Sequence, residues 1–207
     1  MAGSDVKAKY IAADTTAADA DGVCQSQTPA AGGEQALTIN GALASGGVAT
    51  FVAARLITIA SASDDSARTF TVTGTDVNGN VQTEVIAGPA TTVTGTLYFR
   101  TVTEVLVDDN TAGAITVGMS NTSLDVVYAG RARIRGVYLI HTTTAGTIPF
   151  RNGGATGTSM LTVPTPASAN STRDLVIPDE GIMFDSGAYI TYTAGTTVFS
   201  SFVALYN

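Results

Sequence analysis

The sequence contains no tryptophan, one cysteine, one histidine and two lysines, and only 13% of its 207 residues are charged. Ordinary soluble domains carry about 25% charged residues, so hydroxyls, small side chains or neighbouring subunits must cover much of this surface. Cys24 has no partner for an intrachain disulfide, and we interpret it as incidental. The sequence also lacks a signal peptide after Met1 and an apolar run of the about 18 residues that a membrane helix needs, so we expect a cytoplasmic protein without a membrane partner.

The few charges are unevenly distributed along the sequence. Residues 1–130 hold thirteen acids and five bases, a balance of −8, whereas residues 131–207 hold four acids and five bases, a balance of +1. A phosphate backbone would be repelled by the first segment. We therefore expect no nucleic acid among the partners of this protein.

Short runs rich in Val, Ile, Thr, Phe and Tyr make up most of the sequence from residue 35 onward. Turn-forming residues such as Gly46-Gly47, Gly88-Pro89 and Gly113 separate them. Strands at a spacing of about 8–12 residues are typical of sandwiches and barrels. We predict an all-β, antiparallel β-sandwich fold with at least ten strands, arranged as two small sandwich domains over residues 35–129 and 130–207, after an extended N-terminal arm over residues 1–34.

A β-hairpin is the clearest local signal, with Asn78-Gly79 between two alternating runs over residues 68–86. If these two residues form a type I′ turn, both at positive φ, then Val72 lies opposite Val85. This register predicts that Val72 and Val85 share the buried face with Phe70. In the second domain we expect Val203 among the core residues.

The segment 12–34 contains almost no large apolar residue and cannot bury a core by itself. The preceding residues 5–11 alternate polar and apolar side chains, which predicts a short strand. We expect the arm to order against other subunits, with Val6, Tyr10 and Ile11 contacting the partner as an added strand.

Arg131, Arg133 and Arg135 follow one another at a spacing of two residues, so they are predicted to project from one face of a strand. The opposite face would carry Ala132 and Ile134. One interpretation is a solvated sheet face. The alternative is a partner contact in which the arginines bind carboxylates of a neighbouring subunit or of a capsid surface.

Three patterns resemble chemical sites but are better explained as turns, loops and strand ends. Asp76, Asn78 and Asn80 match only the first half of a calcium loop. The Gly-rich segment 153–159 lacks the lysine of a phosphate-binding loop, and His141 follows an apolar strand without a nucleophile motif beside it. We expect no catalytic site, no cofactor and no metal, and hence no enzyme.

Two passages resemble small β-rich structural proteins of tailed-bacteriophage virions. The first is ARLITIASASDDSARTFTVTGTDVNGNVQTEVIAGP, followed by FRTVTEVLV, and the second is IPDEGIMFDSGAYITYTAGTTVFSSFVALYN at residues 177–207. The resemblance implies a protein of the virion, assembled in the host cytoplasm from copies of itself and other virion proteins. It implies a head decoration or cement protein, a neck or tail component, or a fibre-associated domain.

These observations favour a capsid decoration protein that stabilises the head through contacts between subunits. A ring component of the neck or tail is the alternative. A receptor- or carbohydrate-binding β-sandwich is a further alternative, although sugar platforms usually need exposed aromatic side chains and the sequence has no tryptophan.

Overall fold

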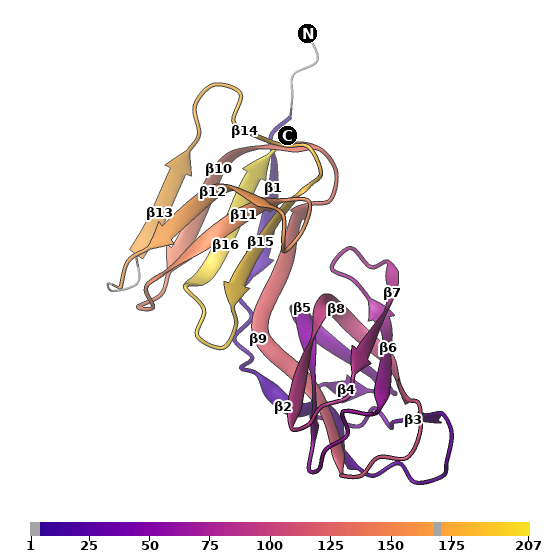
Figure 1. Ribbon diagram of the computed structural model, residues 1–207. Coiled ribbons are helices and arrows are strands. Elements are labelled where there is room, and N and C mark those ends of the chain that lie inside the picture. The colour runs from indigo at the N-terminus through magenta and orange to yellow at the C-terminus, as the bar shows by residue number, and fades with distance from the viewer. Residues whose placement is uncertain (1–4, 168–170) are drawn as a thin grey trace. The chain divides into compact units, whose positions relative to one another are not determined.

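The computed structural model describes residues 5–167 and 171–207 (Figure 1). Within these residues the regular elements are β-strands, and their pairings are antiparallel. The predicted all-β class is confirmed. No helix in the described part of the chain is long and apolar enough to cross a membrane.

The chain divides into two compact units at positions that differ from the predicted ones. Unit 1 combines the described residues up to Thr16 with those from Thr122 onward, and unit 2 comprises Ala17–Asn121. The predicted boundary near Ala129-Gly130 is wrong because β9 (Ile115–Tyr128) is one continuous strand, and the division falls inside it rather than at the following turn.

Unit 1 consists of two sheets. The first has the order β1-β16-β10-β13, with β14 also paired to β10, and the second has the order β12-β11-β15 followed by the carboxyl-terminal half of β9. The bounds of these strands are β1 Lys7–Ala12, β10 Ala132–His141, β11 Gly146–Asn152, β12 Thr158–Thr165, β13 Ser171–Val176, β14 Ile182–Phe184, β15 Ala188–Thr193 and β16 Phe199–Tyr206.

Aromatic side chains join the two sheets of unit 1 into a sandwich. The ring of Phe150 in β11 lies 6.4 Å from that of Phe184 in β14 and 5.7 Å from that of Phe202 in β16. All three rings are fully buried, together with Leu139 and Ile190. Aromatic pairs at these separations contribute about 0.5–1.5 kcal/mol beyond the burial of their area.

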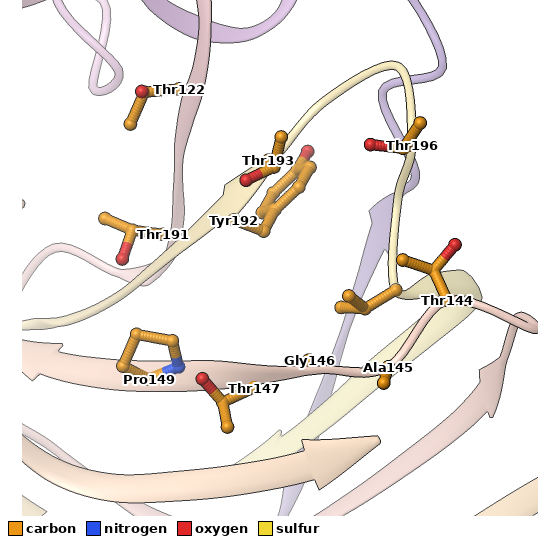
Figure 2. Close-up of a pocket in the computed structure, with 11 residues that line it drawn as sticks. Thr122, Thr144, Ala145, Gly146, Thr147, Pro149, Thr191, Tyr192, Thr193 and Thr196 are labelled. Carbon is orange, nitrogen blue, oxygen red and sulfur yellow. The ribbon is translucent and has the colours of Figure 1, made fainter. Parts of the chain in front are cut away.

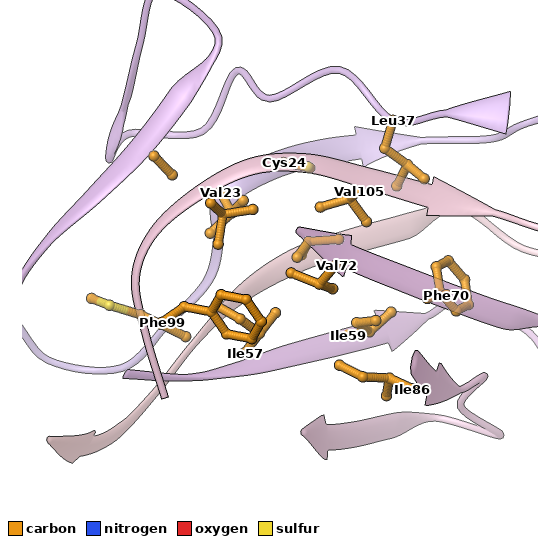
Figure 3. Packing of buried hydrophobic residues seen from close by; sticks show 14 of the residues in the cluster. Val23, Cys24, Leu37, Ile57, Ile59, Phe70, Val72, Ile86, Phe99 and Val105 are labelled. Carbon is orange, nitrogen blue, oxygen red and sulfur yellow. The ribbon is translucent and has the colours of Figure 1, made fainter. Parts of the chain in front are cut away.

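Unit 2 is built around long, bent strands in the order β9-β5-β8-β6-β7, with β2 paired to β9, β3 to β8 and β4 to β5. Their bounds are β2 Asp19–Gln27, β3 Gln35–Ala36, β4 Ala44–Ser45, β5 Val48–Ser61, β6 Thr69–Thr75, β7 Val81–Ala87 and β8 Thr92–Val107. The core contains Ile57, Ile59, Phe70, Val72 and Phe99, each with no exposed surface (Figure 3).

Buried charged side chains in unit 2 are hydrogen-bonded, as burial away from water requires. The Asp65 carboxylate accepts hydrogen bonds from the Ser61 hydroxyl and from the amides of Ala112 and Gly113, at 2.5–3.2 Å. The guanidinium of Arg55 donates to the carbonyl oxygen of Ser120 at 2.7 Å. These contacts fix the loops around the core, and the sequence pattern gave no sign of them.

The predicted arm is wrong for the described residues, and its residues 1–4 lie outside them. Strand β1 pairs with β16 of its own chain, with Ile11 opposite Phe202 and only 3% exposed. Strand β2 contributes the fully buried Val23 and Cys24 to unit 2. One or two apolar residues suffice because each strand is added to the edge of a sheet that other segments build. Removal of residues 1–34 would therefore remove parts of both cores.

The central hairpin lies at the predicted position but has a different turn. Thr75 pairs with Val81, and the amide of Asp76 donates to the carbonyl of Asn80, so the loop has three residues, Val77–Gly79. Only Gly79 has positive φ, at 86°, as in a type I turn followed by a left-handed residue. The Asp76 carboxylate accepts from the amides of Asn78 and Asn80 at 2.8 Å each.

The extra loop residue moves the register of the hairpin by one. Val72 lies opposite Glu84 rather than Val85. Ile86 is therefore buried, whereas Val85 is 67% exposed, which reverses the predicted faces of β7. Glu84 points inward, where its carboxylate accepts hydrogen bonds from the amides of Thr96 and Leu97 in β8.

Replacement of Gly79 with Val should lower the free energy of unfolding of unit 2 by about 1–3 kcal/mol, because a β-branched side chain is strained at positive φ. Gly79→Asn should lose less than half as much, since Asn tolerates the left-handed region. Urea unfolding monitored by circular dichroism measures both changes. Equal midpoints for the parent and Gly79→Val would contradict the turn described above.

The thiol of Cys24 should react only after unfolding. Burial raises its pKa from 9.0 to about 12, so the native protein holds almost no reactive thiolate at pH 8. Ellman's reagent should therefore react slowly with the native chain and rapidly in urea. The folded pKa exceeds the unfolded one, so the free energy of unfolding should fall as the pH rises from about 9 towards about 12. Fast native labelling at pH 8 would contradict the burial; Cys24→Ser, which does not titrate, is the control.

Candidate functional site

The face of the five-stranded sheet that points away from the core of unit 1 is unusually apolar. The strand register places Tyr10 of β1, Val203 of β16, Tyr138 of β10 and Asp174 of β13 in one row. Side chains alternate along each strand, so neighbours such as Phe202 and Leu139 point into the core instead. We define the outer face as Ala8, Tyr10, Arg133, Tyr138, Ile140, Thr172, Asp174, Val176, Ser201, Val203 and Leu205.

Several apolar side chains of the outer face are open to solvent. Tyr10 is 59% exposed, Tyr138 is 39% exposed and Val176 is 73% exposed, while Val203 and Leu205 between them are half-buried. Single exposed apolar residues are common on protein surfaces, but a contiguous apolar patch marks an interaction site. Val203, predicted as a core residue, instead belongs to this patch.

A bulge in β10 brings Arg133 and Tyr138 onto the same face. The pairing of β10 with β16 shifts between Ile134 and Gly136, so one additional residue is inserted there. Before the bulge Arg133 points outward between the buried Ala132 and Ile134, as predicted. After it, Tyr138 points outward and Leu139 inward. Without the bulge, Arg133 would share a face with Leu139.

Arg131 and Arg133 have acidic neighbours within their own chain. Arg131 lies just before β10 rather than within it, and its Nε is 3.3 Å from a carboxylate oxygen of Asp185. The Nη2 of Arg133 is 3.1 Å from Glu180. Such solvent-exposed pairs contribute about 0–1 kcal/mol, so they leave both arginines available to another carboxylate.

A shallow pocket of about 380 Å³ lies at the arginine end of the outer face, lined by Arg131, Ala132, Arg133, Met183 and Asn207. The backbones of Arg133 and Asn207 are joined by two hydrogen bonds, which fix the two residues side by side. The side-chain oxygen of Asn207 is buried and has no hydrogen-bond partner among the described residues. The pocket therefore presents two cations to an acidic partner, beside an amide oxygen that can only accept a hydrogen bond.

The residues predicted to contact a partner are only partly brought together. Tyr10 and Arg133 lie on the outer face, and Val6, which is 52% exposed, precedes β1 on the same alternation. Arg135 is half-exposed at the bulge. Ile11 is in the core, so the prediction that it contacts a partner is wrong while β1 is paired with β16.

A second pocket, of about 430 Å³, opens between β11 and β15 and is lined largely by threonines (Figure 2). The hydrogen-bonded pairing of these strands ends at Phe150 and Ile190. Pro149, which precedes Phe150 in β11, has no N–H group with which to continue it. Thr147 and Thr191 face the gap, and Tyr192 lies beside them. Burial raises the pKa of Tyr192, whose hydroxyl donates to Asp125 at 2.9 Å. The lining residues offer hydroxyls and no charged side chain.

His141 lies at the end of β10, as predicted, where its ring bonds to a backbone carbonyl and to Ser171. Its Nδ1 is 3.0 Å from the carbonyl oxygen of Thr142, which can only accept, and its Nε2 is 2.6 Å from the Ser171 hydroxyl, which then donates. The two residues are direct neighbours across β10 and β13. The pair attaches the edge strand β13 to the sheet, and no sequence pattern links the two positions.

The described residues contain no group of three or more His, Cys, Asp or Glu side chains arranged to hold a metal ion. The candidate functional features described above are the outer face with its arginine pocket and, second, the threonine-lined pocket.

Known protein families and curated proteins provide no match to this chain. Among solved structures it is similar to allantoicase from Saccharomyces cerevisiae, at 7% identity and a TM-score of 0.32, over 97% of this chain and 90% of that one. Another allantoicase structure is similar at 9% identity and a TM-score of 0.29, and the match covers 98% of this chain and 91% of that one. The N-terminal tandem CBM22 domain of Paenibacillus barcinonensis Xyn10C is similar at 14% identity and a TM-score of 0.19. This match covers 99% of this chain and 91% of that one. At these TM-scores, neither fold nor function follows from the similarity.

Proposed function

We propose that this chain is a structural, non-enzymatic protein of a tailed-bacteriophage virion, and that it decorates and stabilises the head through contacts between subunits. The observation that carries the proposal is the outer face of unit 1, where exposed tyrosines and aliphatic side chains adjoin arginines. Tyrosine and arginine are enriched in protein interfaces and at their energetic centres.

The composition of the outer face fits a broad protein contact. Tyr10 and Tyr138 flank Val203 on adjacent strands, so the three side chains present a single apolar strip. A tyrosine loses little side-chain entropy on binding and keeps a hydroxyl for the partner. Arg131 and Arg133, at the amino-terminal end of β10, can exchange their exposed intrachain pairs for carboxylates of the partner.

The resemblance of residues 54–89, 99–107 and 177–207 to virion proteins supports the same proposal, as does the low charge of the chain. A surface with few charges loses little solvation free energy when neighbouring subunits cover it. A ring component of the neck or tail would use the same contact with fewer copies. The number of copies per virion therefore distinguishes a head decoration protein from a ring component. A receptor- or carbohydrate-binding module would use the threonine-lined pocket instead.

The test is co-sedimentation of the purified chain with phage particles that lack it. Replacing Tyr10 and Tyr138 together with Ser should weaken attachment at least about tenfold, because the apolar centre of an interface dominates its affinity. Arg133→Gln should weaken it more strongly at low salt than at high salt, where the charge is already screened.

Met160→Ser is the matched control, since Met160 is 43% exposed on β12, in the other sheet of unit 1. It should bind like the parent. Full attachment of the Tyr10→Ser, Tyr138→Ser double variant would remove the main support for the proposal. Circular dichroism of each variant establishes that it is folded.

A further inference from the structure

Unit 2 carries a second exposed sheet face with little charge, formed by β6, β7 and β8. The register places Thr73 of β6 between Thr83 of β7 and Glu104 of β8, with Val85 and Leu106 on either side of Thr71 in the next row. We define the threonine–valine face as Thr69, Thr71, Thr73, Thr75, Val81, Thr83, Val85, Ala87, Thr101, Glu104 and Leu106.

The edge of this face is an exposed apolar strand. Val81 is 79% exposed and Val85 is 67% exposed, and β7 is the last strand in the order of unit 2. Natural proteins often protect an exposed edge strand with outward-facing charged side chains, above all lysines, or with proline. The charged residue of β7, Glu84, is buried and bonded to β8, so the outward side chains of β7 carry no charge. An edge of this kind is suited to association.

The two units differ sharply in charge. Unit 2 holds ten acids and three bases, a balance of −7, whereas unit 1 holds seven of each. Glu104 is exposed on β8, beside Thr73 of the threonine–valine face, and Arg133 and Arg135 are partly exposed on β10, the strand that also carries Tyr138. Within residues 5–167 and 171–207, neither Glu104 nor Arg135 forms an ion pair.

We propose that the outer face of unit 1 in one copy docks on the threonine–valine face of unit 2 in the next copy. This inference rests on the proposed function, because it names the partner of the outer face. In this contact Tyr10 and Tyr138 of one copy pack against the exposed side chains of Val81 and Val85 of the next, and Arg135 forms an ion pair with Glu104. Pairing the threonine–valine face with itself would instead bring together two units of −7 each, which like-charge repulsion disfavours.

A contact between two different faces is heterologous, so every bound copy still presents one free face of each kind. Such contacts produce a ring if the rotation between copies closes, and an open array if it does not. Both arrangements fit a protein that covers or encircles a virion in many copies.

A complementation experiment tests the pairing of the two faces. One variant combines Tyr10→Ser and Tyr138→Ser and keeps the threonine–valine face; the other combines Val81→Ser and Val85→Ser and keeps the outer face. Each alone should sediment as a monomer at concentrations where the parent associates. An equimolar mixture should form a heterodimer and nothing larger, because only one productive interface remains.

A charge exchange gives an independent readout of the same contact. Glu104→Arg and Arg135→Glu should each weaken self-association about tenfold, since each places like charges together. The two substitutions in one chain should restore it to within about threefold of the parent. Met160→Ser, outside both faces, should leave self-association unchanged.

The outcomes separate this inference from the proposed function. If both variants are monomeric and their mixture stays monomeric, the outer face and the threonine–valine face do not bind each other, and the head-to-tail pairing is wrong. If the Val81→Ser, Val85→Ser variant associates like the parent, or the parent stays monomeric to about 1 mM, the inference is also overturned. In each of these cases the co-sedimentation experiment with phage particles still tests the proposed function independently.

Discussion

Strict alternation along a β-strand is the constraint on which this structure depends, because one choice of register assigns every residue of a strand to the core or to the surface. Two local features set that choice. The three-residue turn at Gly79 turns Glu84 and Ile86 inward and Val85 outward. The bulge after Ile134 turns Leu139 inward and Tyr138 outward. Both exposed faces discussed above follow from these two features.

The sequence predicted what depends on local chemistry. The all-β class follows from the run lengths, and the position of the hairpin and the positive φ of Gly79 follow from the Asn-Gly pair. The Asn-Gly pair also predicts a positive φ for Asn78, but Asn78 does not adopt one. The loop has three residues instead of two, and the Asp76 carboxylate accepts hydrogen bonds from the amides of Asn78 and Asn80. The two central residues alone do not determine whether the chain forms a two-residue type I′ turn or a three-residue loop.

Alternation does not say which face is buried when both faces carry apolar residues. The prediction of a buried Val203 is wrong for this reason, and that of a buried Val85 is wrong because it depends on the type I′ register; both residues lie on exposed faces. The outer face was only partly foreseen because Tyr10, Tyr138 and Val203 come from three distant strands. Arg133 could be predicted because its alternation is local. The prediction of a free arm is wrong because a strand added to an existing sheet needs few apolar residues.

The account makes the outer face of unit 1 the contact that the assembled protein buries. Hydroxyl-radical footprinting of the free chain and of the chain on particles measures this directly at Tyr10 and Tyr138. We expect oxidation of both tyrosines to fall at least about fivefold on assembly, as in the centre of a protein interface, with Met160 on the other sheet unchanged. Equal oxidation of Tyr10 and Tyr138 in the free and assembled states would contradict the account.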